Sequence, residues 1–200
     1  MPVFHIDHKL ADFDKWIAMF REGSARNQLG AKHGVTTRRV ARDSDDPNHA
    51  IVVMEADTKS AVEQMFQEPM VQERFADTSV FAEPPSIISG YEGEDIDPMP
   101  EGEHAAFFID HQLTNFDKWR ETFKSNREAR ADLREKHGTT PVRLLHDIDD
   151  DNHAILIMVG PNRGAVEQLM AEPSLQELFS NSEIFKQPPE IIGQYSPVSL

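Results

Sequence analysis

Residues 3–16 read VFHIDHKLADFDKW, and residues 106–119 follow the same pattern as AFFIDHQLTNFDKW. The first half of this stretch alternates between two faces, and Phe4, Ile6 and His8 share one of them. An alternation with a period of two residues predicts a β-strand, whose successive side chains point to opposite faces of a sheet. The stretch therefore predicts a strand near the start of each of two repeats.

The second half of the stretch changes to helical spacing. Asp12, and Asn115 at the equivalent place, are residues that cap helix N-termini through their side-chain oxygens. Phe13, Trp16 and Phe20 follow at intervals of three and four residues, which is the spacing of the buried face of a helix. The tryptophan is therefore expected to be a core residue.

The repeat extends over most of the chain of 200 residues. It predicts a first domain at residues 1–91, an acidic Pro- and Gly-containing linker at residues 92–104, and a second domain at residues 105–200. The two copies go out of register by one residue near Gly23, which predicts a break in the first helical region. The other matching segments are KHG at 32–34 and 136–138, NHAI at 48–51 and 152–155, AVEQ at 61–64 and 165–168, and PP at 84–85 and 188–189.

Each copy is predicted to follow the order strand, helix, strand, strand, helix, strand. This is the ferredoxin-like pattern, an antiparallel sheet with helices on one face. The predicted fold class is therefore α+β, with two such repeats packed as a pseudo-dimeric α+β barrel. In the first copy the strands are expected at residues 3–10, 36–43, 49–56 and 87–91, and the helices at 13–33, 59–66 and 71–75.

The composition excludes several classes of partner. The net charge of −15 argues against nucleic acid and against anionic membrane surfaces, because both require clustered cations. The chain has no cysteine, so disulfides and thiolate chemistry are absent. The longest apolar runs are too short to span a bilayer. Together with an N-terminus unlike a signal peptide, these features favour a cytoplasmic protein.

The order of motifs resembles a known group of proteins. A strand, then FDKW at the start of a helix (residues 13–16 and 116–119), then an acidic turn before the third strand and a Glu-Pro pair in the second helix, is similar to the dimeric α+β barrel superfamily. The nearest subgroup is the small cyclase-like or antibiotic-biosynthesis-monooxygenase-like proteins. The resemblance covers both repeats and implies a fused pseudo-dimer, with a homodimer of the chain as a further possibility. It also implies a small-molecule ligand, because the superfamily includes cofactor-independent monooxygenases, polyketide cyclases, haem-degrading enzymes and ligand-sensing domains.

The first strand carries the candidate catalytic residues. His8 and His111 stand where similar cyclases place a histidine, and a neutral imidazole there can accept a proton. The alternation of the strand leaves a second choice, since His8 shares a face with Ile6, while Asp7 and Asp110 point to the other side. His8 and His111, or Asp7 and Asp110, are therefore the predicted catalytic groups.

The predicted ligand-binding residues lie on the second and third strands. Arg39 and Arg143 can pair with a strand carboxylate or bind an anionic ligand. Glu55, which is Val159 in the second copy, and His49 and His153, which open the third strand after a turn, complete the set. Arg42 against His146 and His5 against Phe108 also differ, which predicts that the two halves are not equivalent.

No metal site and no cofactor is predicted. The cluster DSDDPNH at residues 43–49 lacks the sixth-position glycine and the twelfth-position glutamate of a calcium loop, so a hairpin turn is expected. His33 and His137 precede a helix-ending glycine, where a cation is favourable against the helix dipole. The sequence contains no phosphate loop, dinucleotide fingerprint or nucleophilic serine motif.

The function that fits these residues is a small-molecule-binding α+β barrel, either a cofactor-independent monooxygenase or a cyclase acting on an aromatic or polyketide-like compound. The alternative is a non-enzymatic module that binds a ligand or oligomerises under stress. An enzyme requires a cavity lined by convergent polar groups, whereas a structural module is packed solid with apolar side chains.

Overall fold

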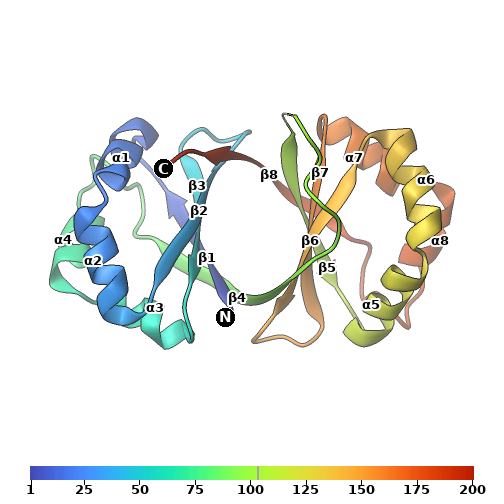
Figure 1. The fold of residues 1–200 in the computed structure, drawn as a ribbon, viewed down its shortest axis with the longest axis horizontal. Coiled ribbons are helices and arrows are strands. Elements are labelled where there is room, and N and C mark those ends of the chain that lie inside the picture. Colours follow the sequence, from blue (N-terminus) through green and yellow to red (C-terminus); the bar gives the residue numbers. More distant parts are fainter. Residues whose placement is uncertain (103) are drawn as a thin grey trace. The chain divides into compact units, whose positions relative to one another are not determined.

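A computed structural model describes residues 1–102 and 104–200; Glu103, which belongs to the predicted linker, lies outside the described residues. The first copy has the expected order of strands and helices (Figure 1). Its elements are β1 (Val3–Lys9), α1 (Phe13–Arg21), α2 (Ser24–His33), β2 (Thr36–Asp43), β3 (His49–Glu55), α3 (Lys59–Phe66), α4 (Pro69–Phe75) and β4 (Ser86–Asp95).

The second copy repeats this order, so the predicted β-α-β-β-α-β pattern is confirmed in both halves. Its elements are β5 (Ala105–Gln112), α5 (Phe116–Ser125), α6 (Arg127–His137), β6 (Thr140–Asp147), β7 (His153–Gly160), α7 (Arg163–Met170), α8 (Pro173–Phe179) and β8 (Glu190–Val198). None of the helices in the described part of the chain is both long and apolar enough to cross a membrane.

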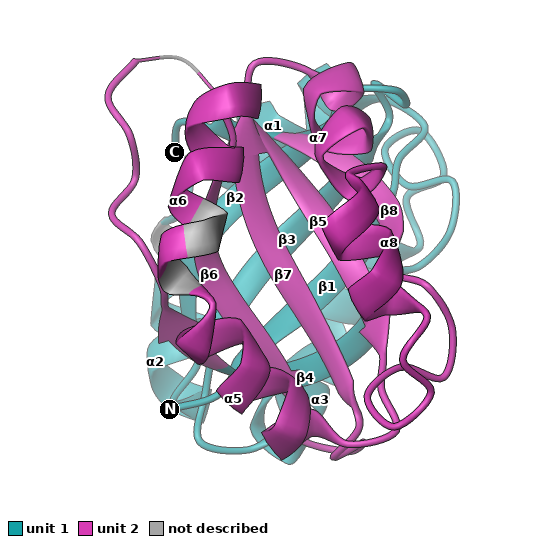
Figure 2. Ribbon diagram, turned by 90° about the vertical axis from the view of Figure 1, so that its right-hand side faces the viewer, with its two compact units in different colours: residues 1–92, 196–200 teal, residues 93–195 magenta. Residues whose placement is uncertain are grey.

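The chain divides into two compact units (Figure 2). Unit 1 comprises residues 1–92 and 196–200, and unit 2 comprises residues 93–195. Two strands continue across the division: β4 extends to Asp95, through the first residues of the predicted linker, and the last residues of β8 belong to unit 1.

Each unit has an antiparallel sheet with the same internal pairing. In unit 1, β1 lies between β3 and β4, and β2 pairs with β3. In unit 2, β5 lies between β7 and β8, and β6 pairs with β7. The predicted α+β class, with two ferredoxin-like repeats, is therefore confirmed.

Local chemistry explains where the helices begin and end. The side chains of Asp12 and Asn115 accept the backbone N–H groups of Lys15 and Lys118, at 3.0 and 2.9 Å, so both predicted N-caps are confirmed. The predicted break is also present, because Gly23 has a positive φ of 44° between α1 and α2. A residue with a side chain adopts this conformation only with strain, so glycine separates the two helices.

The core of each unit lies between the sheet and its own helices. In Figure 1, α1–α4 lie on one side of the unit 1 sheet and α5–α8 on one side of the unit 2 sheet. Phe4 and Ile6 of β1 are fully buried there, against Trp16 and Val62 from the helices. The equivalent residues of unit 2 are also buried, but there Phe107 and Ile109 of β5 belong to one cluster and Trp119 to another. Both tryptophans are core residues, as the helical spacing predicts.

Candidate functional site

The first strand of each unit separates its two candidate catalytic groups onto opposite faces. His8 is buried on the side that faces the helices, where its ring lies 5.1 Å from the ring of Trp16 between centroids. Asp7 points the other way and contacts His49. His8 and Asp7 therefore belong to two different sites, and the same division separates His111 from Asp110.

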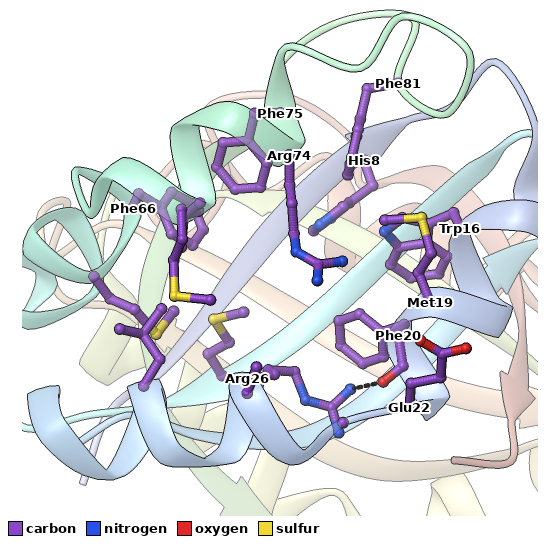
Figure 3. Close-up of a pocket in the computed structure, with 17 residues that line it drawn as sticks. His8, Trp16, Met19, Phe20, Glu22, Arg26, Phe66, Arg74, Phe75 and Phe81 are labelled. Atoms are coloured by element: carbon purple, nitrogen blue, oxygen red, sulfur yellow. Dashed lines mark hydrogen bonds between the residues drawn. The ribbon is translucent and has the colours of Figure 1, made fainter.

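A cavity of about 230 Å³ lies between the sheet and helices of unit 1 (Figure 3). Its wall is mostly apolar, and its few polar side chains come from four different elements or their ends. The aromatic lining residues are Trp16, Phe20, Phe66, Phe75 and Phe81, the methionines are Met19, Met54, Met65 and Met70, and the charged or titratable residues are His8, Glu22, Arg26 and Arg74. An apolar cavity with a few convergent polar groups is the usual form of a ligand site.

His8 is the one titratable group of this lining that is fully buried. Its Nδ1 donates a hydrogen bond of 3.2 Å to the carbonyl oxygen of Ile6. Because a carbonyl can only accept, the proton of the neutral ring is on Nδ1 and the lone pair is on Nε2. Figure 3 shows the ring directed into the cavity. The site therefore presents a neutral acceptor to any ligand.

Burial sets the protonation of His8. Desolvation lowers the pKa of the imidazole to about 4, against the smaller raising effects of the Ile6 carbonyl and of Asp7. The ring is neutral at pH 7 and able to accept a proton. It is also a weak base, so a ligand anion formed beside it must be stabilised by other groups.

Two arginines supply positive charge to the same cavity. Arg26 of α2 lies over the ring of Phe20, with 4.0 Å between the guanidinium carbon and the ring centroid, and donates to the Phe20 carbonyl oxygen at 2.6 Å. Its Nε is buried without a hydrogen-bond partner among the described residues, and burial lowers the pKa of its guanidinium. Arg74 extends from α4 into the cavity (Figure 3). Neither arginine forms an ion pair with a carboxylate of the described residues.

Unit 2 has an equivalent but smaller cavity of about 110 Å³. His111 occupies the place of His8, with its Nδ1 3.0 Å from the carbonyl oxygen of Ile109, and desolvation lowers its pKa to about 4 as well. The position of Arg74 is taken by Leu178. The arginine that does line this cavity, Arg134, forms an ion pair with Asp97. As far as the described residues go, the two cavities share a histidine but differ in available positive charge.

The opposite face of each sheet holds a histidine between two carboxylates. His153 bonds through Nε2 to Asp110 and through Nδ1 to Asp147, both at 2.7 Å. In unit 1, His49 bonds in the same way to Asp7 at 2.5 Å and to Asp43 at 3.0 Å. Four of these residues are predicted site residues, but the sequence does not indicate the two bridges.

The carboxylates raise the pKa of both bridging histidines. The hydrogen bond to Asp110, helped by Asp147 and opposed by burial, raises the pKa of His153 to about 9. At His49, burial lowers the pKa of the ring. The hydrogen bonds to Asp43 and Asp7 raise it, and the net shift is upward. A protonated histidine that bridges two carboxylates is a poor general base, because both of its ring nitrogens already carry protons. We interpret the bridges as structural.

The remaining predicted ligand-binding residues do not line the cavity of unit 1. Arg39 is exposed on β2. Glu55 forms an ion pair with Arg38, the residue before Arg39, with 2.5 Å between Nη2 and Oε1. Arg143 pairs with Asp95 at 2.7 Å in unit 2. The structure thus brings neither arginine to a strand-one histidine, and the arginines beside His8 are Arg26 and Arg74.

The acidic cluster at residues 43–49 forms a turn. Asp43 accepts the backbone N–H of Asp45 at 2.8 Å, and Asp46 accepts that of Asn48 at 2.9 Å. Within the described residues, no group of three or more His, Cys, Asp or Glu side chains is arranged to hold a metal ion. His33, at the end of α2, bonds to Glu68 at 2.7 Å, which supports its predicted structural role.

Comparison with known proteins supports the fold. No protein-family model and no curated protein sequence matches the chain. Among solved structures, an anthrone oxidase-like protein is similar with a TM-score of 0.58 and 11% identity, covering 99% of this chain and 91% of that one. A Lactobacillus acidophilus protein, assigned provisionally as a monooxygenase, gives a TM-score of 0.54 and 14% identity, with 98% and 93% covered. A Fusobacterium nucleatum protein with the same provisional assignment gives 0.51 and 12%, with 99% and 93% covered.

These similarities cover almost the whole of this chain and of each solved structure. The fold is therefore the dimeric α+β barrel fold, as the motif order indicates, in the form of two fused repeats. At such identities the likeness concerns the fold and carries no residue roles, so the activity must be argued from the site.

Proposed function

We propose that the chain binds a compact aromatic molecule in the cavity of unit 1 and that His8 removes a proton from it, as in a cofactor-independent monooxygenase or cyclase. The observation that carries this proposal is the buried His8, whose free Nε2 lone pair is directed into an aromatic- and methionine-lined cavity. The volume of about 230 Å³ lies just below the usual range for ligand pockets, which suits a ligand of few rings.

The residues suggest how an oxidation would begin. His8 accepts a proton from an acidic C–H or phenolic O–H group of the ligand, and Arg74 and Arg26 stabilise the resulting anion. The electron-rich anion then reduces molecular oxygen directly. For an anthrone, the two methylene hydrogens leave with one oxygen atom as water, and the other oxygen atom becomes the new carbonyl of the quinone. The described lining supplies the base and the cations for this reaction.

The provisional assignments of the neighbouring folds give a first substrate to test. Anthrone and dissolved oxygen should be consumed in equal amounts, with anthraquinone and water as products, faster with the protein than without it. The His8→Gln variant should lower kcat by roughly a hundredfold or more, because general-base catalysis typically contributes a factor of that size. An oxygen electrode and the absorbance of anthraquinone measure both quantities.

The control is His33→Gln, the same substitution in the same unit but outside the cavity. It should leave kcat and KM unchanged. The pH dependence adds a second criterion: since the pKa of His8 is lowered to about 4, kcat/KM should persist as the pH falls from 7 to 5, unlike that of an enzyme with an ordinary histidine base. A rate unaffected by His8→Gln would refute the catalytic role.

A non-enzymatic ligand-binding protein is the second candidate. The low basicity of His8 favours it, because a weak base serves equally well as a hydrogen-bond acceptor that orients a ligand. Binding of an aromatic ligand without oxygen consumption, weakened by His8→Gln, would support this second function over the first.

A further inference from the structure

Positive charge is scarce in this acidic protein. The chain has 35 Asp and Glu residues against 20 Lys and Arg residues. Most basic side chains with a defined contact are bound to a carboxylate, as in the pairs Lys32–Glu68, Arg38–Glu55 and Arg143–Asp95. An arginine that lines a cavity without a carboxylate partner is therefore available to an anionic ligand.

Arg26 and Arg74 are two such arginines, and both line the cavity that contains His8. Arg26 is held by its cation–π contact with Phe20 and by the Phe20 carbonyl oxygen, which leaves its guanidinium charge uncompensated. Its Nε is buried and lacks a hydrogen-bond partner among the residues described, which normally costs free energy. Glu22 also lines the cavity, but it is exposed and forms no ion pair with either arginine in the described part of the structure.

The second cavity provides an internal comparison. Its histidine and aromatic residues match those of the first, yet Leu178 replaces Arg74 and Asp97 neutralises Arg134. Packing around the shared histidine therefore does not require a free arginine. Among the described residues, an unpaired arginine therefore lines the unit 1 cavity and none lines that of unit 2.

We propose that the ligand of the unit 1 cavity is an aromatic anion, with a carboxylate or phenolate bound by Arg74 and Arg26, and that the unit 2 cavity accepts uncharged apolar molecules. This inference rests on the ligand-binding function proposed above and adds the ligand class and its specificity determinants. Arginine suits the task, because its planar group binds a carboxylate through two parallel hydrogen bonds.

A matched pair of probes tests the charge preference. 2-Naphthoate and 2-naphthamide have the same rings and nearly the same shape, and only the first is an anion. Calorimetric titration of the full chain at pH 7 should show naphthoate binding at least roughly tenfold more tightly, because a charge-assisted hydrogen bond contributes more than a neutral one. Raising the salt concentration should weaken naphthoate binding and leave naphthamide binding unchanged.

Arg74→Leu is the informative variant, because leucine is the residue that unit 2 carries at this position. Arg74 is exposed and leucine is compatible with the same fold in the second copy, so the variant should fold normally. It should lose the preference for naphthoate and retain naphthamide binding, and Arg74→Lys should restore part of the preference. Leu178→Arg should enable unit 2 to bind naphthoate.

The possible failures are distinguishable. If both probes bind equally and Arg74→Leu changes neither, the ligand-binding function survives and the anion preference is wrong. If neither probe binds, both the proposed function and the charge preference are overturned for ligands of this size.

Discussion

Acidification from pH 7 to pH 4.5 should lower the free energy of unfolding by roughly 2–3 kcal/mol for each of the two buried histidines. His8 and His111 are almost completely buried, and desolvation lowers the pKa of each to about 4. Few single groups of this chain are expected to affect stability as strongly.

The direction follows from proton binding in the two states. An unfolded histidine binds a proton as the pH falls through about 6.5, whereas the folded one stays neutral until about pH 4. Between these values the unfolded state binds more protons, so acid favours it. This stabilisation is complete above pH 6.5 and is lost as the pH falls through about 4. The carboxylates with lowered pKa values, such as Asp43 and Asp110, act below this window.

The two tryptophans allow each unit to be measured separately. Trp16 contacts His8 and Trp119 contacts His111, so Trp119→Phe leaves a reporter for unit 1 and Trp16→Phe one for unit 2. Urea unfolding followed by tryptophan fluorescence should show, in both variants, a lower free energy of unfolding at pH 4.5 than at pH 7. His8→Phe, which cannot titrate, should remove the acid dependence from unit 1 and leave it in unit 2. If the unfolding free energy of unit 1 still fell with pH as steeply in the His8→Phe protein, His8 would not be the group responsible.

The fold was predictable because its signals are local and occur twice. The alternation in β1 and the spacing of Phe13 and Trp16 each indicate one element, and their recurrence after 103 residues removes most of the ambiguity of a single short pattern. The break at Gly23 was predictable for the same reason, since only a comparison of the copies shows the shift in register. Strand order also follows once two ferredoxin-like repeats are recognised.

The site was only partly predictable, because it depends on contacts between distant segments. The alternation correctly separates His8 from Asp7, but it cannot show that His49, 42 residues further on, bonds to Asp7. Arg39 is the predicted ligand-binding arginine because it lies on a strand, whereas the arginines beside His8 lie on helices. The internal comparison did contain a signal for one of them: QERF at residues 72–75 becomes QELF at 176–179, which replaces Arg74 by Leu178 within a matching segment.

Replacing His153 by glutamine should destabilise unit 2 by roughly 2–3 kcal/mol at pH 7, because it removes the cation that separates two partly buried carboxylates. The side chains of His153, Asp110 and Asp147 are only 16%, 17% and 8% exposed, so water compensates the repulsion poorly. His49→Gln should destabilise unit 1 in the same direction, since the pKa of His49 is also raised and its bonds are at 2.5 and 3.0 Å.

The pH dependence distinguishes this bridge from ordinary packing. The pKa of His153 is raised to about 9, so its contribution is fully present below pH 6.5 and is lost as the pH rises through about 9. The difference in unfolding free energy between the wild type and His153→Gln should therefore be largest near pH 6.5 and small at pH 10. Asp147→Asn supplies the control, because it keeps the ring in place but removes one carboxylate, which should lower the pKa of His153 and move the alkaline loss of stability to lower pH. A difference that stayed constant from pH 6.5 to 10 would mean that His153 acts through its shape and packing, and that the carboxylates tolerate each other without a cation.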